Sequence, residues 1–262
     1  MLIFAHRGDS GNFPENTLPS YRSACLKAPD FVEADIRLSA DGEVVISHDN
    51  NLKRTGRTDR SISDMTLDEI KSVDVSFQDK YGDKYSPCRV PTAREALSLF
   101  AEYGQKTILE LKDPEAAPKL KRIMDETGYA EKGNIIEVWS IRDAEYARQY
   151  FRKAFFYFVS SNFDEYSAFP DKAEYFAMLR NAGISGWAFR YAKLSDIDRN
   201  EFIYLARIYR VTLLAWNLDD ENTVREALAI EVRKNGVTAR IGAISSNYPA
   251  MLLKVRAEKP LR

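Results

Sequence analysis

Residues 2–11 read Leu2-Ile3-Phe4-Ala5-His6-Arg7-Gly8-Asp9-Ser10-Gly11, an apolar run that passes directly into a polar turn. The apolar half has the length and composition of a buried β-strand. The turn after it distinguishes between two α/β architectures, because an open, doubly wound sheet usually carries a glycine-rich phosphate turn at this point. Here the turn is too polar and its glycines have the wrong spacing. The stretch therefore favours a closed barrel over a doubly wound sheet.

Seven further apolar or β-branched runs follow, separated by segments with helical periodicity. The expected strands are 2–5, 31–38, 107–111, 135–138, 155–158, 186–189, 212–215 and 243–245. The expected helices are 18–27, 93–103, 116–127, 143–151, 171–182, 196–209 and 222–234. Eight alternating units in a chain of 262 residues predict a (β/α)8 barrel, the TIM barrel of the α/β class.

The stretch from Asn50 to Pro91 interrupts this alternation. It shows a short helical segment near 67–73 but no clear strand, and it is too long for a simple loop in a compact domain. We therefore expect residues 1–262 to form a single catalytic barrel domain, in which residues 50–91 are a small insertion over the barrel mouth.

The composition, 45% hydrophobic and 29% charged, is that of an ordinary globular protein. A net charge of −1 gives no reason to expect nucleic acid or a stable membrane association, so the expected partner is a small molecule. Cys25 and Cys88 form no CxxC or zinc pattern and are expected to be idle buried thiols. The chain shows no basic leader and no membrane-spanning run, and we expect a cytoplasmic location. Nothing in the sequence indicates an oligomeric state.

The chain has only two histidines, His6 and His48, and each follows an apolar, strand-like run. Because the unperturbed pKa of histidine lies near neutrality, such a pair can supply both an acid and a base at cellular pH. Either residue taken alone is more often a hydrogen-bonded structural histidine. The carboxylates between them decide the interpretation.

Three carboxylates, Glu33, Asp35 and Glu110, lie in two of the expected strands. Glu33 and Asp35 are two residues apart and therefore face the same side, and catalytic groups of this architecture cluster at the carboxyl ends of strands. A set of carboxylates without cysteine or histidine favours one hard divalent cation, Mg²⁺ or Ca²⁺, over structural zinc. Each acid alone is also compatible with a solvated charge at a strand end.

Two cations adjoin this set. Arg7 follows His6, and Lys112 is two residues from Glu110 in the same strand-like run. A guanidinium can grip two phosphate oxygens while an ammonium adds a point charge, so the pair is suited to bind a phosphate. Arg54, Arg57 and Arg60 form a further cationic run, which we interpret as a solvated face.

These residues lie in a series of motifs that occur in a fixed order. The motifs are His6-Arg7-Gly8, Pro14-Glu15-Asn16-Thr17, Glu33-Ala34-Asp35, Asp41-Gly42-Glu43-Val44-Val45-Ile46-Ser47-His48-Asp49 and Glu110-Leu111-Lys112. The series resembles the glycerophosphodiester phosphodiesterase family, whose pattern is HRG, PENT, E-x-D, DG-x-x-V-x-x-HD and E-L/I-K. Residues 91–97 resemble the family's P-T-L-x-E-x-L helix entry, and residues 215–217 resemble its late W-T-V-N strand more loosely. The resemblance implies a TIM barrel with a small insertion after its second strand unit.

The resemblance also implies a reaction, the metal-dependent hydrolysis of glycerophosphodiesters to sn-glycerol 3-phosphate and an alcohol. The roles that it implies are an acid/base pair, three ligands of one divalent cation and two phosphate contacts, namely His6 and His48, Glu33, Asp35 and Glu110, and Arg7 and Lys112. In the mechanism proposed for the family, the glycerol 2-hydroxyl attacks phosphorus and water then opens the cyclic phosphate. The two histidines exchange their roles as base and acid between these steps.

Two positions depart from the family pattern. Asn247 stands where the family often has an aspartate, and Trp139 precedes Ser140 where the family commonly has a Ser-Phe pair. Both changes leave the implied catalytic set complete and bear on the substrate instead. An alternative is a lysophospholipase D or sphingomyelinase D-like phosphodiesterase, which the polar insertion disfavours. An alternative of another class is a non-catalytic barrel that binds phosphorylated ligands, which the complete catalytic set disfavours.

Overall fold

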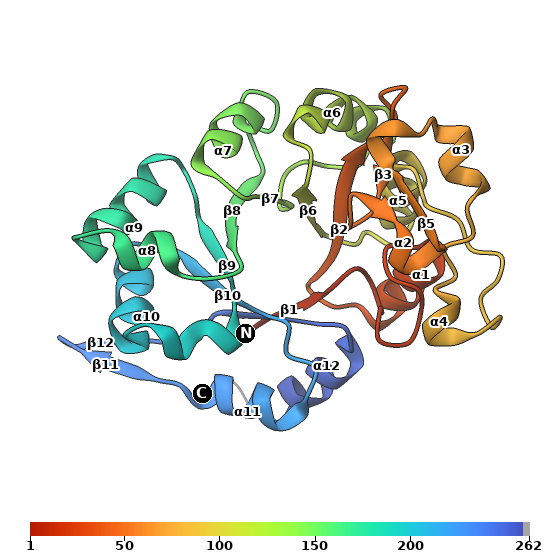
Figure 1. Ribbon diagram of the computed structural model, residues 1–262. Helices are drawn as coiled ribbons and strands as arrows, with labels where there is room; N and C mark the ends of the chain where they lie inside the picture. Colours follow the sequence, from red (N-terminus) through yellow and green to blue (C-terminus); the bar gives the residue numbers. More distant parts are fainter. Residues whose placement is uncertain (259–262) are drawn as a thin grey trace.

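The computed structural model describes residues 1–258, so residues 259–262 of the expected domain lie outside the described residues. Eight parallel strands form a closed barrel in the order β1-β13-β10-β9-β8-β7-β6-β2, and pairing of β1 with β2 closes the ring (Figure 1). They are β1 (Leu2–Ala5), β2 (Phe31–Leu38), β6 (Thr107–Leu111), β7 (Ile135–Val138), β8 (Phe155–Ser160), β9 (Gly186–Arg190), β10 (Thr212–Trp216) and β13 (Ala243–Ser246). The predicted TIM barrel is confirmed.

Helices follow the strands and cover the outside of the barrel, as Figure 1 shows. They are α1 (Leu18–Lys27), α5 (Ala93–Glu102), α6 (Ala117–Glu126), α7 (Ile141–Arg148), α8 (Asp164–Ala168), α9 (Lys172–Asn181), α10 (Arg199–Ile208), α11 (Glu221–Ala229) and α12 (Pro249–Glu258). Local capping helps to define their ends; Thr92 and Glu95, for example, form a capping box at the start of α5. No helix within residues 1–258 is both long and apolar enough to cross a lipid bilayer.

The inside of the barrel holds an apolar layer beneath a polar one. Phe4, Phe31 and Ile108 belong to a buried cluster, in which the rings of Phe4 and Phe31 stack with centroids 4.7 Å apart. Because side chains alternate along a strand, the residue two positions later faces the same side, nearer the carboxyl end. On β2 and β6 these later positions are Glu33 and Glu110. This apolar cluster, called the barrel floor below, therefore packs directly beneath the layer that contains the predicted carboxylates.

One predicted helix is wrong in its last part. The segment 222–234 was expected to be helical, but α11 ends at Ala229 and β11 (Val232–Lys234) pairs antiparallel with β12 (Val237–Ala239). Asn235 and Gly236 connect these strands with φ values of 51° and 75°. Two residues with positive φ form the kind of hairpin turn for which Asn-Gly is preferred, and this turn overrides the helical periodicity.

The insertion contains more regular structure than expected. It includes the hairpin of β4 (Asn51–Leu52) and β5 (Thr58–Ser61), with α2 (Lys53–Gly56), α3 (Leu67–Ser72) and α4 (Gln78–Tyr81). The helix near 67–73 is confirmed as α3, but the absence of strands was wrong because these strands are too short and polar to show an alternating pattern. A small apolar cluster of its own, including Leu52, Ile62 and Ile70, packs the insertion together. The segment β3 (Val44–Ile46) that leads into it pairs antiparallel with β2 and is not a barrel strand.

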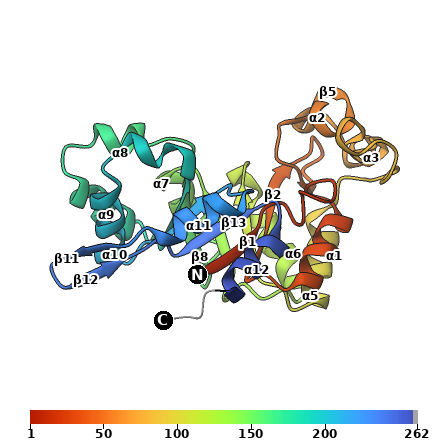
Figure 2. The same cartoon turned by 90° about the horizontal axis from the view of Figure 1, so that it is seen from below.

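The insertion is anchored to the loop that follows β1. The Tyr81 hydroxyl donates hydrogen bonds to the carbonyl oxygens of Ser10 (2.8 Å) and Phe13 (3.0 Å), and the Tyr85 hydroxyl donates to that of Asn12 (2.6 Å). Figure 2 shows α2, β5 and α3 at one end of the molecule, away from α5 and α12. The assignment of one catalytic domain with this insertion over its mouth stays a prediction. Cys25 and Cys88 are free and buried, as expected.

Candidate active site

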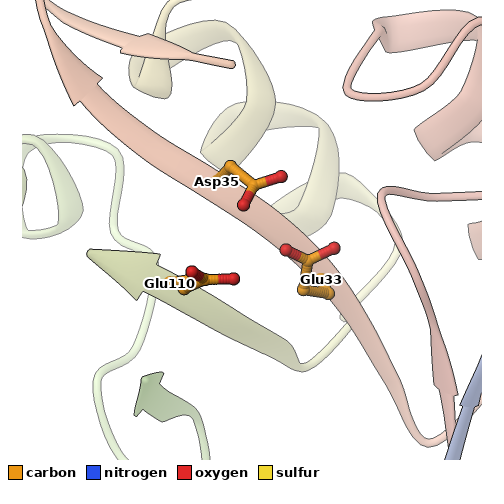
Figure 3. A group of neighbouring side chains, drawn as sticks. All are labelled: Glu33, Asp35 and Glu110. Atoms are coloured by element: carbon orange, nitrogen blue, oxygen red, sulfur yellow. The ribbon is translucent and has the colours of Figure 1, made fainter. Parts of the chain in front are cut away.

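The three predicted carboxylates come together between two neighbouring strands. Asp35 on β2 is the register partner of Glu110 on β6, and Glu33 lies two residues before Asp35 on the same side. One carboxylate oxygen of each residue lies within 4.8 Å of the others, and all three side chains are buried (Figure 3). Three buried carboxylates this close together can surround a single ion.

Hydrogen bonding leaves part of this cluster without a partner. Glu33 Oε2 accepts a hydrogen bond from the Arg7 backbone N–H at 2.6 Å, but Glu33 Oε1 has no partner among the described residues. Asp35 Oδ2 accepts from Asn16 Nδ2 at 2.7 Å, while Oδ1 makes only a 3.2 Å ionic contact with Lys112 Nζ. Buried polar atoms in proteins rarely lack partners, and an all-oxygen set suits hard cations. The residues therefore fit a divalent cation.

The carboxylates have unlike protonation equilibria. Burial, together with the negative charge of Asp35, raises the pKa of Glu33 well above its ordinary value and also raises the pKa of Glu110. Burial acts in the same direction on Asp35, but the cationic Lys112 and Arg7 outweigh it and lower the pKa of Asp35. Without a cation, both glutamates therefore hold a proton more strongly than an exposed glutamate does.

Cation binding should consequently release protons. A bound cation favours ionised glutamates, so the affinity for Mg²⁺ or Ca²⁺ is expected to rise with pH until the raised pKa values of Glu33 and Glu110 are passed. Calorimetric titrations at one pH in buffers of different ionisation enthalpy would count the released protons. A binding enthalpy that is independent of the buffer would contradict this prediction.

His6 is held by residues from the other end of the chain. Its Nδ1 lies 2.8 Å from Asn247 Oδ1, and Asn247 Nδ2 in turn donates to Asp219 Oδ2 at 2.5 Å. The Asn217 amide lies 3.4 Å from His6 Nε2. Burial and the neighbouring Arg7 guanidinium lower the pKa of His6 to about 3. The His6 imidazole is therefore neutral at neutral pH.

His48 follows β3 and has a different partner. Its Nδ1 lies 2.7 Å from Asp49 Oδ1, and Asp49 Oδ2 accepts from Arg54 Nε at 2.8 Å. The Arg37 guanidinium donates to the His48 carbonyl oxygen at 2.8 Å, which fixes the backbone at this residue. The two histidines therefore have different hydrogen-bond partners, an amide for His6 and a carboxylate for His48.

The two predicted phosphate contacts flank the carboxylates. Arg7 Nη1 donates to Glu15 Oε1 at 2.7 Å, and its Nε lies 3.3 Å from Asp35 Oδ2. Lys112 Nζ contacts both Asp35 and Glu110. Carboxylates thus hold both cationic side chains in place, with their positive charge close to the cluster of Glu33, Asp35 and Glu110.

One arginine of the cationic run does more than cover a solvated face. Arg57 and Arg60 are exposed, as expected, but Arg54 also binds both oxygens of Glu15, at 2.6 and 2.8 Å. Through Glu15 it reaches Arg7, and through Asp49 it reaches His48. The insertion thereby contacts the partners of two predicted site residues. Sequence spacing carries no signal for such a link.

A single pocket gathers six of the seven predicted residues, and Asp35 is fully buried beside it. The six are His6, Arg7, Glu33, His48, Glu110 and Lys112. Sequence reasoning missed Glu137, which lines the same pocket and is the register partner of Glu110. A charged residue inside the apolar run of β7 was the available signal. Trp139 Nε1 donates to Glu110 Oε1 at 2.6 Å, so this departure from the family pattern contacts the carboxylate cluster.

Residues 6–238 match the model of the glycerophosphoryl diester phosphodiesterase family. The chain belongs to this family. Among curated members, a glycerophosphodiester phosphodiesterase of Caldanaerobacter subterraneus is 33% identical over 151 residues, which is 55% of this chain and 61% of that protein. One from Bacillus subtilis is 35% identical over 127 residues, or 46% of this chain and 43% of that protein. The chain thus spans roughly half the length of these curated relatives.

Solved structures of glycerophosphodiester phosphodiesterases and related enzymes share the fold. A phosphodiesterase of Oleispira antarctica, solved in complex with the product sn-glycerol 3-phosphate, has a TM-score of 0.82 at 24% identity and is matched over 98% of this chain and 97% of its own. The enzyme of Thermotoga maritima has a TM-score of 0.74 at 21% identity, with 98% of each chain covered. At these identities the likeness establishes the barrel fold alone.

Proposed function

We propose that this protein hydrolyses glycerophosphodiesters to sn-glycerol 3-phosphate and an alcohol, with the help of one divalent cation, Mg²⁺ or Ca²⁺. The observation that carries the proposal is the convergence of three buried carboxylates, two of which line a pocket that also holds two histidines and two cationic side chains. Family membership supports the same reaction. Glu33, Asp35 and Glu110 would hold the cation.

The phosphodiester carries a negative charge that repels nucleophiles, and its alkoxide is a poor leaving group. Arg7 and Lys112 stand where they can bind the phosphoryl oxygens and stabilise the charge that builds on them. A bound divalent cation would add Lewis-acid stabilisation of the same oxygens. Lys112 keeps its charge in this role because, although burial opposes it, Asp35 and Glu110 raise its pKa.

The unlike environments of the histidines suggest an order of proton transfers. His6 is neutral, and donation of its Nδ1–H to Asn247 makes Nε2 the acceptor of the ring, which would take the proton of the glycerol 2-hydroxyl in place of its 3.4 Å contact with the Asn217 amide. His48, whose ring is oriented by the contact of Nδ1 with Asp49, would give a proton to the departing alcohol. In the second step, the opening of the cyclic phosphate by water, the roles reverse. Each histidine can serve in both steps, because its Nδ1 contacts a protein side chain and each proton transfer uses only Nε2.

An assay with two substrates and three metal conditions tests the proposal. Purified protein is incubated with glycerophosphocholine or glycerophosphoethanolamine, in Mg²⁺, Ca²⁺ or EDTA, and sn-glycerol 3-phosphate is measured. Turnover that depends on the cation is expected. Cleavage restricted to lysophosphatidylcholine or sphingomyelin would favour the lysophospholipase D or sphingomyelinase D-like alternative. Binding of sn-glycerol 3-phosphate without turnover of any diester would favour a non-catalytic barrel.

We predict that Arg54 positions the catalytic groups from the insertion. Arg54→Met removes the contacts to Glu15 and Asp49, and we expect kcat to fall by about 10- to 100-fold, as for other residues that orient ligands or catalytic groups. Arg57→Met is the matched control, because Arg57 contacts only the exposed Asp79 and Gln78 of the insertion. Steady-state kinetics of both variants would check this. Equal effects of the two substitutions would mean that Arg54 has no positioning role.

A further inference from the structure

Glu137 is a buried carboxyl that the proposed reaction does not use. It lies on β7, is 5% exposed and lines the pocket that holds the predicted catalytic residues. Its Oε1 is fully buried, and the carboxyl accepts no hydrogen bond from any residue of the described chain. Buried carboxyl groups nearly always have hydrogen-bond partners, since losing water without replacement is costly. A bound ligand would supply the missing partner.

The carboxylate cluster does not supply that partner. The set of oxygens within 4.8 Å of one another comprises Glu33, Asp35 and Glu110, and Glu137 is not part of it. The nearby donors are also engaged, because Lys112 Nζ and Trp139 Nε1 both donate to Glu110. Glu137 therefore lies beside the three carboxylates, as the register partner of Glu110, without belonging to their set.

Much of the wall of this pocket is apolar. Ile108, Val159, Ala188 and Leu214 belong to the buried cluster of the barrel floor and also line the pocket. The pocket is also lined by Trp216 on β10, whose indole Nε1 is buried and has no acceptor within residues 1–258. One pocket thus combines apolar walls with one free acceptor and one free donor.

A hydroxyl on a short alkyl chain complements these groups. Its O–H can donate to the carboxyl, its oxygen can accept from an indole N–H, and its carbon atoms can contact the apolar walls. An ionised phosphate oxygen only accepts hydrogen bonds and so gives the Glu137 oxygen no donor, and a long acyl chain would leave both polar groups unpaired. Glycerol moieties offer a suitable hydroxyl, because once the 2-hydroxyl acts as nucleophile only the terminal hydroxyl is free.

We propose that Glu137, with Trp216, forms a subsite for the terminal hydroxyl of the glycerol moiety and makes the enzyme selective for glycerol esters over deoxy analogues. This inference rests on the proposed function, because it assumes that a glycerophosphodiester is bound. The subsite places the glycerol moiety against the barrel floor and leaves the alcohol group toward the barrel mouth.

The test compares two substrates that differ in one hydroxyl. Glycerophosphocholine is set against 2-hydroxypropyl phosphocholine, which keeps the 2-hydroxyl nucleophile but lacks the terminal hydroxyl. The wild-type protein is expected to favour glycerophosphocholine in kcat/KM by about 10- to 100-fold, the range expected when a buried polar group loses its partner. Glu137→Leu should abolish this preference by lowering only the value for glycerophosphocholine. Glu137→Gln, which keeps an acceptor oxygen, should retain part of it.

Binding measurements give a readout that does not depend on turnover. The affinities for sn-glycerol 3-phosphate and propane-1,2-diol 1-phosphate are measured by calorimetry, and the wild type should favour the former while Glu137→Leu should not. Glu145→Leu is the matched control, since Glu145 is an exposed glutamate on α7, the helix after β7. It should leave both preferences unchanged.

The outcomes separate this inference from the proposed function. Wild-type turnover without preference between the substrates, or equal losses on both in Glu137→Leu, would overturn the subsite and leave the function standing. Absence of turnover on any glycerophosphodiester would overturn the function. Even then, selective binding of sn-glycerol 3-phosphate that is lost in Glu137→Leu would support the subsite, and binding without selectivity would overturn it.

Discussion

Replacement of His48 by alanine is expected to lower kcat on glycerophosphocholine by about 10³-fold, within the range for loss of a general acid or base. His6→Ala should have an effect of the same order. The chain has no third histidine that could substitute, and the two rings have separate partners, Asn247 and Asp49. Initial-rate kinetics of both variants at saturating cation would measure the losses.

A change of leaving group distinguishes the two histidines. A p-nitrophenyl ester departs without a proton, so His48→Ala should regain most of its activity on glycerophospho-p-nitrophenol if His48 is the acid of the first step. His6→Ala should stay impaired, because the 2-hydroxyl still needs a base. Both variants should bind Mg²⁺ or Ca²⁺ like the wild type, since neither histidine belongs to the carboxylate cluster. Full activity of either variant would remove that residue from the acid/base pair.

Glu33→Gln is expected to have opposite effects on activity and on the stability of the cation-free protein. It removes one charged oxygen ligand, so cation affinity should fall and kcat/KM should drop by at least about 10²-fold. In EDTA, where no cation is bound, we expect the substitution to raise the stability of the protein. Burial and Asp35 raise the pKa of Glu33, so the stability of the cation-free wild type is highest below the ordinary pKa of glutamate and declines as pH rises from there to the raised pKa. The amide does not ionise, and the variant avoids this decline.

Thermal unfolding in EDTA across a pH series, repeated with saturating cation, would check this prediction. The melting temperature of Glu33→Gln should exceed that of the wild type increasingly toward alkaline pH, and the order should reverse with cation, which stabilises only proteins that bind it. Glu102→Gln is the control, because Glu102 is exposed and its one ion pair within residues 1–258, with Arg22, is a long surface contact of 4.0 Å. A Glu33→Gln variant with wild-type cation affinity would exclude Glu33 from the cation site.

Much of the barrel could be predicted from the sequence because its strands are short apolar runs with sharp ends. Each of the eight strands begins at the predicted residue, and the ends differ by at most two residues, as at Ser160 of β8. Parallel strands buried on both faces carry a strong composition signal. The convergence of the carboxylates also followed from sequence, because residues two apart on a strand share a face and strand ends meet at one rim.

The errors have local or long-range causes. The hairpin at Asn235-Gly236 depends on a turn of two residues, which an average over a helical window hides. The contacts of Arg54 depend on how the insertion packs against the loop after β1, and spacing along the chain carries no information on such packing. Glu137 was visible as a charge in an apolar run, but its position beside the site required the register between β6 and β7.

Barrel closure has a consequence for the order in which the protein gains its properties. The carboxylates lie on β2 and β6, which pair directly. His6, in contrast, depends on the end of β13: its backbone N–H donates to Ser246, the last residue of this strand, and its ring contacts Asn247, the residue after it. A partly folded chain with β13 undocked would therefore capture a cation without an oriented imidazole. On refolding, cation binding should return before turnover. Docking of β13 would thus be the folding step after which a cation-binding intermediate gains catalytic activity.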